Sequence, residues 1–101
     1  MKTMTAAALA LLLMSGATHD VSQKGKTFSV SDLTVAVGDE VRFHNDDDVT
    51  HNVFSMTQGH TFNLAVQEPG TNSTVKFDAA GDIEVRCAFH PDMKMVVHVQ
   101  P

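Results

Sequence analysis

The sequence predicts an all-β protein, an antiparallel β-sandwich of about six to eight short strands. From residue 18 onward, short segments alternate between apolar and polar residues with the two-residue period of a β-strand. Turn-forming residues separate these segments at intervals of about 8 to 12 residues, as in sandwich domains. No stretch after residue 17 has the 3.6-residue apolar period of an amphipathic helix.

Residues 1–17 have the layout of a secretory signal peptide. Lys2 precedes an apolar run at residues 6–14, and small residues then lead to Ala17. A buried N-terminal helix or a membrane span is the alternative, but the run is far shorter than the roughly 20 residues that a span needs. We therefore expect a periplasmic or secreted protein, cleavage after Ala17, a mature domain at residues 18–101, and no membrane span in the mature form.

The chain of 101 residues has room for one domain only. Removal of residues 1–17 takes away one of the seven Lys and Arg and none of the twelve Asp and Glu, which changes the formal charge from −5 to −6. This acidic balance argues against nucleic acid and anionic membranes as partners. It permits a basic protein partner, although a net negative charge can also serve only to keep a protein soluble. We expect the mature protein to be a monomer.

In the first half of the domain, strands are predicted at residues 28–30, 33–37 and 40–44. Gly38 and Asp39 lie between the second and the third of these and predict a two-residue hairpin. The alternation of the third strand points His44 outward, so we expect a solvated strand residue there rather than a metal ligand.

In the second half, strands are predicted at residues 74–77 and 83–87 and around residues 97–99, while residues 62–66 fit a short strand or an irregular loop. An acidic loop at residues 45–50 leads the chain to His51. The alternation places Cys87 on the inward face of its strand, where a thiolate is kept away from water and oxidants. The same argument places His98 on the outer face.

Three side chains with metal-binding groups follow one another near the C-terminus. Cys87, His90 and Met93 are each three residues from the next, and a thiolate, an imidazole and a thioether together suit copper better than other common metals. A mononuclear copper site of this kind needs a second imidazole, for which His51 is the candidate. Cys87 is the only cysteine, so in an oxidising compartment it can form no internal disulfide, and metal ligation would give it a role. A buried free thiol that packs as a small apolar group is the alternative.

With these motifs the chain resembles the cupredoxins, the small blue copper proteins. The resemblance covers residues 25–100: residues 41–45 lead to the pair His51-Asn52, and the motif Cys87-x2-His90-x2-Met93 follows near the C-terminus. The compact ligand loop looks most like that of the amicyanins, with the plastocyanins and pseudoazurins close behind.

The resemblance implies a Greek-key sandwich with one type 1 copper ion per chain, bound by His51, Cys87, His90 and Met93. It also implies a soluble one-electron carrier rather than an enzyme, because a coordination sphere filled by protein leaves no position for a substrate. Redox proteins such as a c-type cytochrome or a periplasmic oxidoreductase are the expected partners. Asn52 is expected to brace the ligand loops through hydrogen bonds.

Met95 is the alternative axial ligand, since it reproduces the longer His-x4-Met spacing of plastocyanin-like proteins. Strand phase favours Met93, because Met95 would leave too few residues before Pro101 for a full closing strand. Arg86 precedes Cys87 at a position where the best-known members carry an aromatic residue, and the chain has no Tyr or Trp. An electron route through an aromatic neighbour of Cys87 is therefore not expected.

A copper-binding module for delivery or resistance, which exchanges its metal, is the alternative function. For a carrier, the ring edge of His90 is the expected exit of the electron, within a small apolar docking surface. Asp92 and the acidic run Asp46 to Asp48 lie in or near the predicted ligand loops, where they are placed to steer a basic partner. A solvated turn is the alternative for the acidic run.

Overall fold

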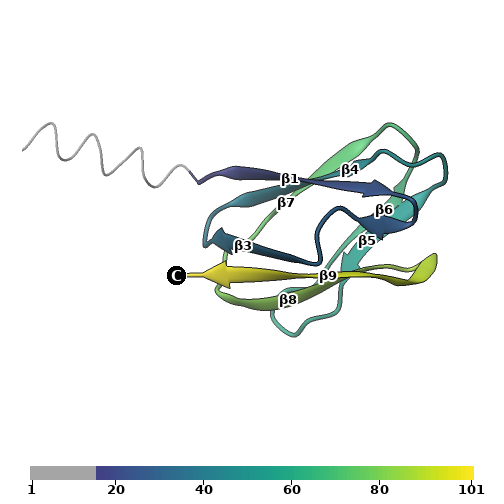
Figure 1. The fold of residues 1–101 in the computed structure, drawn as a ribbon. Helices are drawn as coiled ribbons and strands as arrows, with labels where there is room; N and C mark the ends of the chain where they lie inside the picture. Colours follow the sequence, from purple (N-terminus) through teal and green to yellow (C-terminus); the bar gives the residue numbers. More distant parts are fainter. Residues whose placement is uncertain (1–15) are drawn as a thin grey trace, which may run out of the picture.

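The computed structural model of this chain describes residues 16–101, so most of the predicted signal segment, residues 1–15, lies outside the described residues. This part of the chain is all β, as predicted, with nine strands arranged in two layers (Figure 1). The strands are β1 (Thr18–Lys24), β2 (Thr27–Phe28), β3 (Asp32–Ala36), β4 (Glu40–Asn45), β5 (His51–Ser55), β6 (Phe62–Gln67), β7 (Asn72–Lys76), β8 (Gly81–Cys87) and β9 (His90–Gln100). None of residues 16–101 belongs to a helix that could cross a membrane.

One sheet has four strands in the order β2-β1-β4-β7, and the other has five in the order β3-β9-β8-β5-β6. The total of nine strands exceeds the expected six to eight, because neither β1 nor β5 was predicted as a strand. The β1 sequence THDVSQK shows little apolar alternation, since the two side chains that it buries are Val21 and the polar Gln23. A strand that buries polar groups carries no clear periodic signal.

Two strand pairs are parallel, whereas the prediction was of antiparallel pairing. β1 runs parallel to β4 and β3 runs parallel to β9, while the other pairs are antiparallel. The predicted hairpin at Gly38 and Asp39 is wrong, because β3 and β4 belong to different sheets and the segment between them crosses from one layer to the other. Gly38 has a φ of 94°, and its N–H donates to the carbonyl of Phe77. Alternation specifies which face a side chain occupies, but it does not specify the neighbouring strand.

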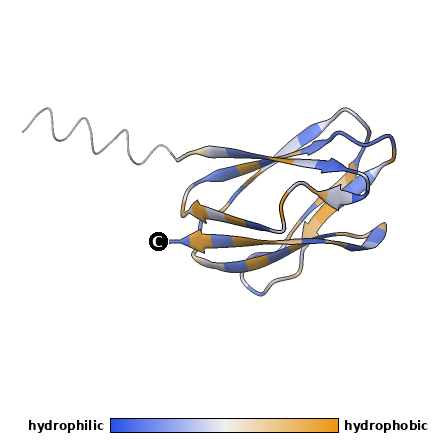
Figure 2. Ribbon diagram, in the orientation of Figure 1, coloured by the Kyte–Doolittle hydropathy of each residue, from blue (hydrophilic) through white to orange (hydrophobic). Residues whose placement is uncertain are grey.

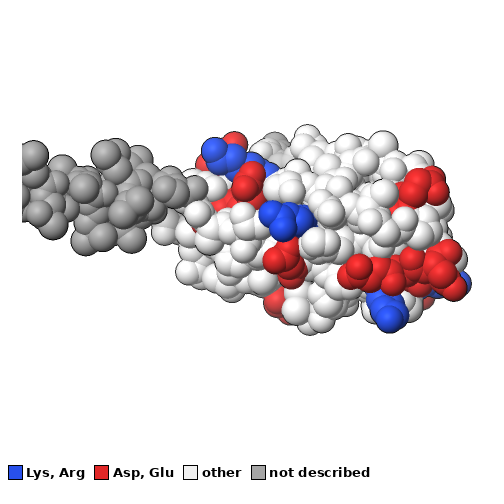
Figure 3. All heavy atoms as spheres, turned by 90° about the horizontal axis from the view of Figure 1, so that it is seen from above, with Lys and Arg blue, Asp and Glu red and all other residues white. Residues whose placement is uncertain are grey.

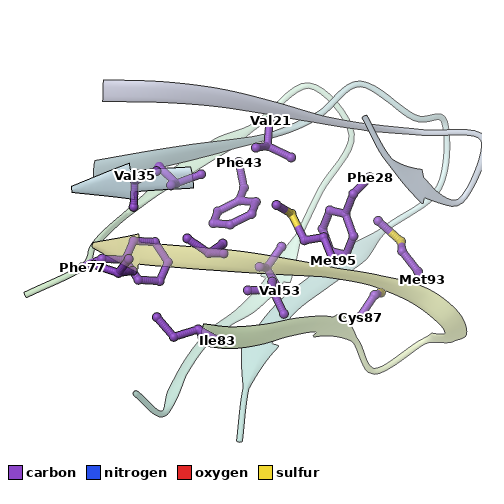
Figure 4. Packing of buried hydrophobic residues seen from close by; sticks show 14 residues of the cluster. Val21, Phe28, Val35, Phe43, Val53, Phe77, Ile83, Cys87, Met93 and Met95 are labelled. Carbon is purple, nitrogen blue, oxygen red and sulfur yellow. The ribbon is translucent and has the colours of Figure 1, made fainter. Parts of the chain in front are cut away.

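The hydrophobic core fills the space between the two sheets (Figure 4). Apolar and polar residues alternate along β9 (Figure 2), so that Met93, Met95, Val97 and Val99 all point inward. The buried apolar residues are Val21, Phe28, Val35, Val41, Phe43, Val53, Phe77, Ile83, Val85, Cys87, Met93, Met95, Val97 and Val99. Cys87 thus lies at the edge of a continuous apolar cluster.

A buried polar link joins the two sheets at the end of the sandwich opposite the C-terminus. Gln23 of β1 donates from Nε2 to Oε1 of Gln67 in β6, over 2.7 Å, and Gln67 donates from Nε2 to the carbonyl of Phe43 at 3.2 Å. Buried amides are costly without partners, so these bonds favour one relative placement of the sheets. The β4–β5 loop and the β8–β9 turn lie at this same end (Figure 1).

Candidate metal centre

His51 opens β5, and its side chain is completely buried. Its Nε2 lies 2.9 Å from Oδ2 of Asp47, and its Nδ1 lies 3.8 Å from Sγ of Cys87. An ionised carboxylate only accepts hydrogen bonds, so Nε2 carries a proton, and in the neutral ring Nδ1 then presents its lone pair to the sulfur. This is the tautomer that a metal ligand at Nδ1 requires.

The Asp47 carboxylate is held by three donors. Oδ2 accepts from the backbone N–H of Lys26 at 2.9 Å as well as from His51, and Oδ1 accepts from the backbone N–H of Asp48 at 3.0 Å. The bond from Lys26, followed by the bond from His51, holds the pKa of Asp47 well below its usual range. Asp47 is therefore ionised at neutral pH.

Asn45 shapes the loop that presents Asp47. Its Oδ1 accepts from the N–H of Asp47 at 3.0 Å, and its Nδ2 donates to the carbonyls of Val49 (3.0 Å) and Gln67 (2.9 Å). The first contact is an Asx turn, in which a side chain closes the loop in place of a backbone carbonyl. The sequence interpretation missed the contact between Asp47 and His51, although an acid four positions before a candidate ligand was a signal that could have found it.

Cys87 ends β8, and its side chain is 3% exposed. Its sulfur faces the interior, as the strand parity predicts. Sγ lies 3.5 Å from Nδ1 of His90 and accepts a hydrogen bond from the backbone N–H of Asn52 at 3.3 Å. On the opposite face of the same strand, Arg86 donates from Nε to Glu84 at 2.6 Å, so the charged pair points away from the sulfur.

His90 opens β9 after a two-residue turn, and it is partly buried. Its ring centroid lies 4.9 Å from that of His51, with the ring planes at 61°. Burial lowers the pKa of His90, repulsion from His51 and Lys26 lowers it further, and attraction to Asp47 opposes these effects. A lowered pKa keeps the imidazole neutral at physiological pH, which leaves a lone pair for a metal.

One ligand atom from each of His51, Cys87 and His90 lies within 4.8 Å of the other two. With bonds of roughly 2.0–2.3 Å to nitrogen and sulfur, donors in a trigonal plane are separated by about 3.5–4 Å. The two distances from Sγ to the imidazole nitrogens, 3.8 and 3.5 Å, agree with that spacing. Two imidazoles and one thiolate are the equatorial donors of a type 1 copper site, so the residues present fit this metal.

Met93 and Met95 both point inward from β9, each with 1% exposure. Met95 pairs with Val85 in the β8–β9 ladder, whereas the ladder becomes irregular where it reaches Cys87 and the turn. Met93 lies nearer this turn, at the same end as Cys87, while Met95 lies deeper among the core side chains (Figure 4). Of the two thioethers, Met93 is therefore the better placed for an axial contact.

Asn52 connects the strands that surround the sulfur. Its Nδ2 donates to Oδ1 of Asn63 (2.8 Å) and to the carbonyl of Ala65 (2.7 Å), and its Oδ1 accepts from the N–H of Ala88 at 3.3 Å. One side chain thus joins β5, β6 and the β8–β9 turn. The bracing role that the resemblance implied for Asn52 is present in the structure.

The other histidines of the described residues lie outside this group. His44 contacts Asp20 at 2.7 Å on the outer face of its sheet, in agreement with the predicted outward position. His98 also lies on an outer face, with Nε2 and Nδ1 each 2.8 Å from the carboxylates of Asp32 and Asp82. Among the His, Cys, Asp and Glu side chains of residues 16–101, His51, Cys87 and His90 form the one group of three or more whose ligand atoms are close enough to hold a metal.

The surface next to His90 combines apolar and charged side chains. Phe89 is 49% exposed, and a shallow depression of about 260 Å³ lies beside it. Its lining residues are Lys26, Phe89, His90, Pro91, Asp92 and Met93. Asp and Glu side chains gather at this end of the molecule (Figure 3), where the acidic β4–β5 loop exposes Asp46 and Asp48.

Comparison with known proteins shows the family to which this chain belongs. Residues 16–100 match the sequence model of a family described as copper binding proteins, plastocyanin/azurin family. The methylamine utilization protein MauL of Methylorubrum extorquens is 34% identical over 64 residues, which are 62% of this chain and 56% of MauL. The chain thus matches little more than half the length of that relative.

Solved structures with the same architecture include three kinds of copper protein. A purple cupredoxin from Nitrosopumilus maritimus is 26% identical with a TM-score of 0.73, over 81% of this chain and 99% of that one. A reduced amicyanin variant is 24% identical with a TM-score of 0.76 over 82% of both chains, which establishes a shared fold. A copper-containing nitrite reductase from Thermus scotoductus is 26% identical with a TM-score of 0.76, over 82% of this chain but only 22% of the reductase.

Proposed function

Because the chain belongs to the plastocyanin/azurin family of copper-binding proteins, we propose that it is an exported one-electron carrier with one type 1 copper ion per chain. The observation that carries this proposal is the convergence of two imidazole nitrogens and one thiol sulfur within 4.8 Å in the buried end of a sandwich. This donor set is the one that type 1 copper requires, and the spacing of the donors suits a trigonal plane.

In this proposal His51, Cys87 and His90 would hold the copper ion, and Met93 would be its fourth, weakly bound ligand. Bound copper supplies the Cu(I)/Cu(II) couple. The chain supplies rigidity, since the bonds of Asp47 to His51 and of Asn52 to the surrounding strands hold the donors in place. Donors that keep their positions in both oxidation states need little rearrangement, and little rearrangement favours fast electron transfer.

Burial of the donors supports a carrier rather than an enzyme. His51, Cys87 and Met93 are buried, and only the ring of His90 is partly exposed. Catalytic metal sites keep an open position for substrate, whereas these four side chains fill the coordination sphere. Since this chain covers 22% of the nitrite reductase, that likeness supplies no argument for the activity of the whole enzyme.

The exposed edge of His90 is the proposed exit of the electron. Phe89 and Pro91 flank it and provide the apolar contact that suits a weak, transient complex. Asp46 and Asp48 are exposed at the same end and would steer a basic redox partner, such as a c-type cytochrome or a periplasmic oxidoreductase. We further propose a periplasmic, monomeric mature protein that begins at Thr18.

The visible spectrum of the processed protein with one equivalent of Cu(II), followed by ascorbate and then ferricyanide, tests the proposal. A carrier should show an intense sulfur-to-copper charge-transfer band that bleaches on reduction and returns on oxidation. A pale or absent band, with copper that a chelator removes readily, would contradict the carrier function and favour a protein that delivers copper.

A further inference from the structure

Asp47 differs from the other acids of the β4–β5 loop in where its carboxylate lies. Its side chain is only 10% exposed, and its Oδ2 contacts Nε2 of His51 at 2.9 Å. Asp46 and Asp48, on either side, are exposed. The two exposed acids are accessible to a partner, whereas Asp47 faces a buried ring and is poorly placed for that role.

Two contacts that involve the backbone determine the position of this carboxylate. The Asx turn from Asn45 directs the loop, and the N–H of Lys26 donates to the same Oδ2 that contacts His51. Lys26 lies in the β1–β2 turn with a φ of 60°, next to Gly25 with a φ of 63°, as in a two-residue type I′ hairpin. Lys26 adopts the left-handed conformation that few non-glycine residues take, and its N–H points at Asp47.

An anionic acceptor affects a metal-bound imidazole differently from a neutral one. The negative charge on Asp47 polarises the Nε2–H bond, which increases the electron density at Nδ1 and makes the ring a stronger donor. A stronger donor stabilises the more highly charged metal ion to a greater degree. The carboxylate also holds the ring in one tautomer and one orientation, with Nδ1 toward Sγ of Cys87.

We propose that Asp47 is a positioning residue for His51, whose carboxylate orients the ring for copper and stabilises Cu(II) relative to Cu(I), so that it lowers the reduction potential. This inference rests on the proposed function, since it assigns a role to Asp47 at the same copper site. The acidic loop would then have two functions. Asp47 acts on the metal through His51, whereas Asp46 and Asp48 interact with a partner at the surface.

The test compares Asp47→Asn with the matched control Asp48→Asn. Each substitution removes one negative charge from the same loop with a side chain of similar shape, but only the first removes the anionic partner of His51. We expect Asp47→Asn to weaken Cu(II) binding by about tenfold or more in chelator competition, to weaken Cu(I) binding less, and to raise the reduction potential. Asp48→Asn should leave all three quantities close to those of the wild type.

Equal shifts in the two variants would overturn the inference, because a general charge effect would then explain them, and so would an unchanged potential in Asp47→Asn. Circular dichroism of both copper-free variants checks that the fold is retained. If the wild-type protein itself shows no charge-transfer band with Cu(II), the proposed function fails; if the wild type is blue and Asp47→Asn behaves like Asp48→Asn, only the role of Asp47 fails.

A second measurement needs no variant and no copper. Nitrogen-15 NMR of the histidine side chains in the copper-free wild-type protein reports which ring nitrogen of His51 carries the proton. We expect the Nε2–H tautomer at neutral pH, with the proton in the hydrogen bond to Asp47. The Nδ1–H tautomer, or a rapid mixture of the two, would contradict the positioning role.

Discussion

The backbone N–H of Asn52 donates to the sulfur of Cys87 over 3.3 Å and joins residues that are 35 positions apart. The bond runs from β5 to β8. Asn52 directly follows the candidate ligand His51, and Cys87 is itself a candidate ligand. A hydrogen bond to a thiolate withdraws electron density from it, and such bonds are one means by which a protein tunes the potential of a copper site. The geometry of the bond depends on Asn52, whose side chain holds this part of β5 in place.

Asn52→Ala should destabilise the copper-free protein by about 1–3 kcal/mol. The substitution removes the donor to Asn63 and Ala65 and the acceptor of the Ala88 N–H, and it leaves partners without hydrogen bonds. Urea unfolding measures the change. Asn72→Ala, at an exposed position of β7, is the control and should have little effect. Equal stability of Asn52→Ala and the wild type would show that Asn52 is not a brace.

Met93→Leu should keep copper but raise its reduction potential, because the proposed axial donor to Cu(II) is lost. Met95→Leu should leave the potential unchanged and change stability by less than about 1.5 kcal/mol, since it exchanges core side chains of similar volume. Cyclic voltammetry and urea unfolding of the two variants separate these effects. The reverse pattern in the potentials would assign the axial position to Met95.

Cys87→Ser should abolish the charge-transfer band without unfolding the domain. Serine has a similar shape but offers no thiolate, and the site is formed by strands whose pairing does not depend on the sulfur. Titration with Cu(II) followed in the visible range, together with circular dichroism, checks both expectations. A band of wild-type intensity in this variant would exclude Cys87 as the source of the colour.

His98 should make stability depend on pH. Hydrogen bonds with Asp32 and then Asp82 raise its pKa, so the folded state favours the protonated ring. Its contribution is therefore complete below the pKa of the unfolded chain, about 6.5, and is lost as the pH rises through the higher pKa of the folded state.

The measurement is the difference in urea midpoint between wild type and His98→Gln, on copper-free protein. All other titrating groups are common to both proteins. The difference should be largest near pH 5.5 and should shrink at about pH 9. A difference that is constant across this range, or that grows with pH, would contradict the assignment.

The alternation of the sequence was sufficient to predict the β-sandwich and the inward direction of the Cys87 sulfur. It could not predict the parallel pairs, because a two-residue period is the same whichever strand lies alongside. For that reason Gly38 and Asp39 were assigned to a hairpin, whereas they carry the chain between layers. β1 was not predicted because its inward side chains include the polar Gln23, whose Nε2 donates to Gln67 in the interior.

The spacing of Cys87, His90 and Met93 was sufficient to predict three ligands of a copper site, because a local motif brings these side chains together within one hairpin. His51 was predicted because this kind of site needs a second imidazole, and the structure places its ring next to Cys87. The contact of Asp47 was not predicted, since it depends on the turn at Asn45 and on a backbone N–H from a distant hairpin. Assignment of Met93 as the axial ligand stays a prediction.

The parallel pairing of β3 with β9 has a consequence for how the protein acquires its metal. These strands come from the two ends of the domain, so the five-stranded sheet closes only after nearly the whole chain has been organised. Domains dominated by such distant pairs fold in roughly milliseconds to seconds. Cys87 and His90 share a local hairpin, but His51 reaches them only when β5 docks against β8. During biogenesis, therefore, the five-stranded sheet should form before the protein binds copper.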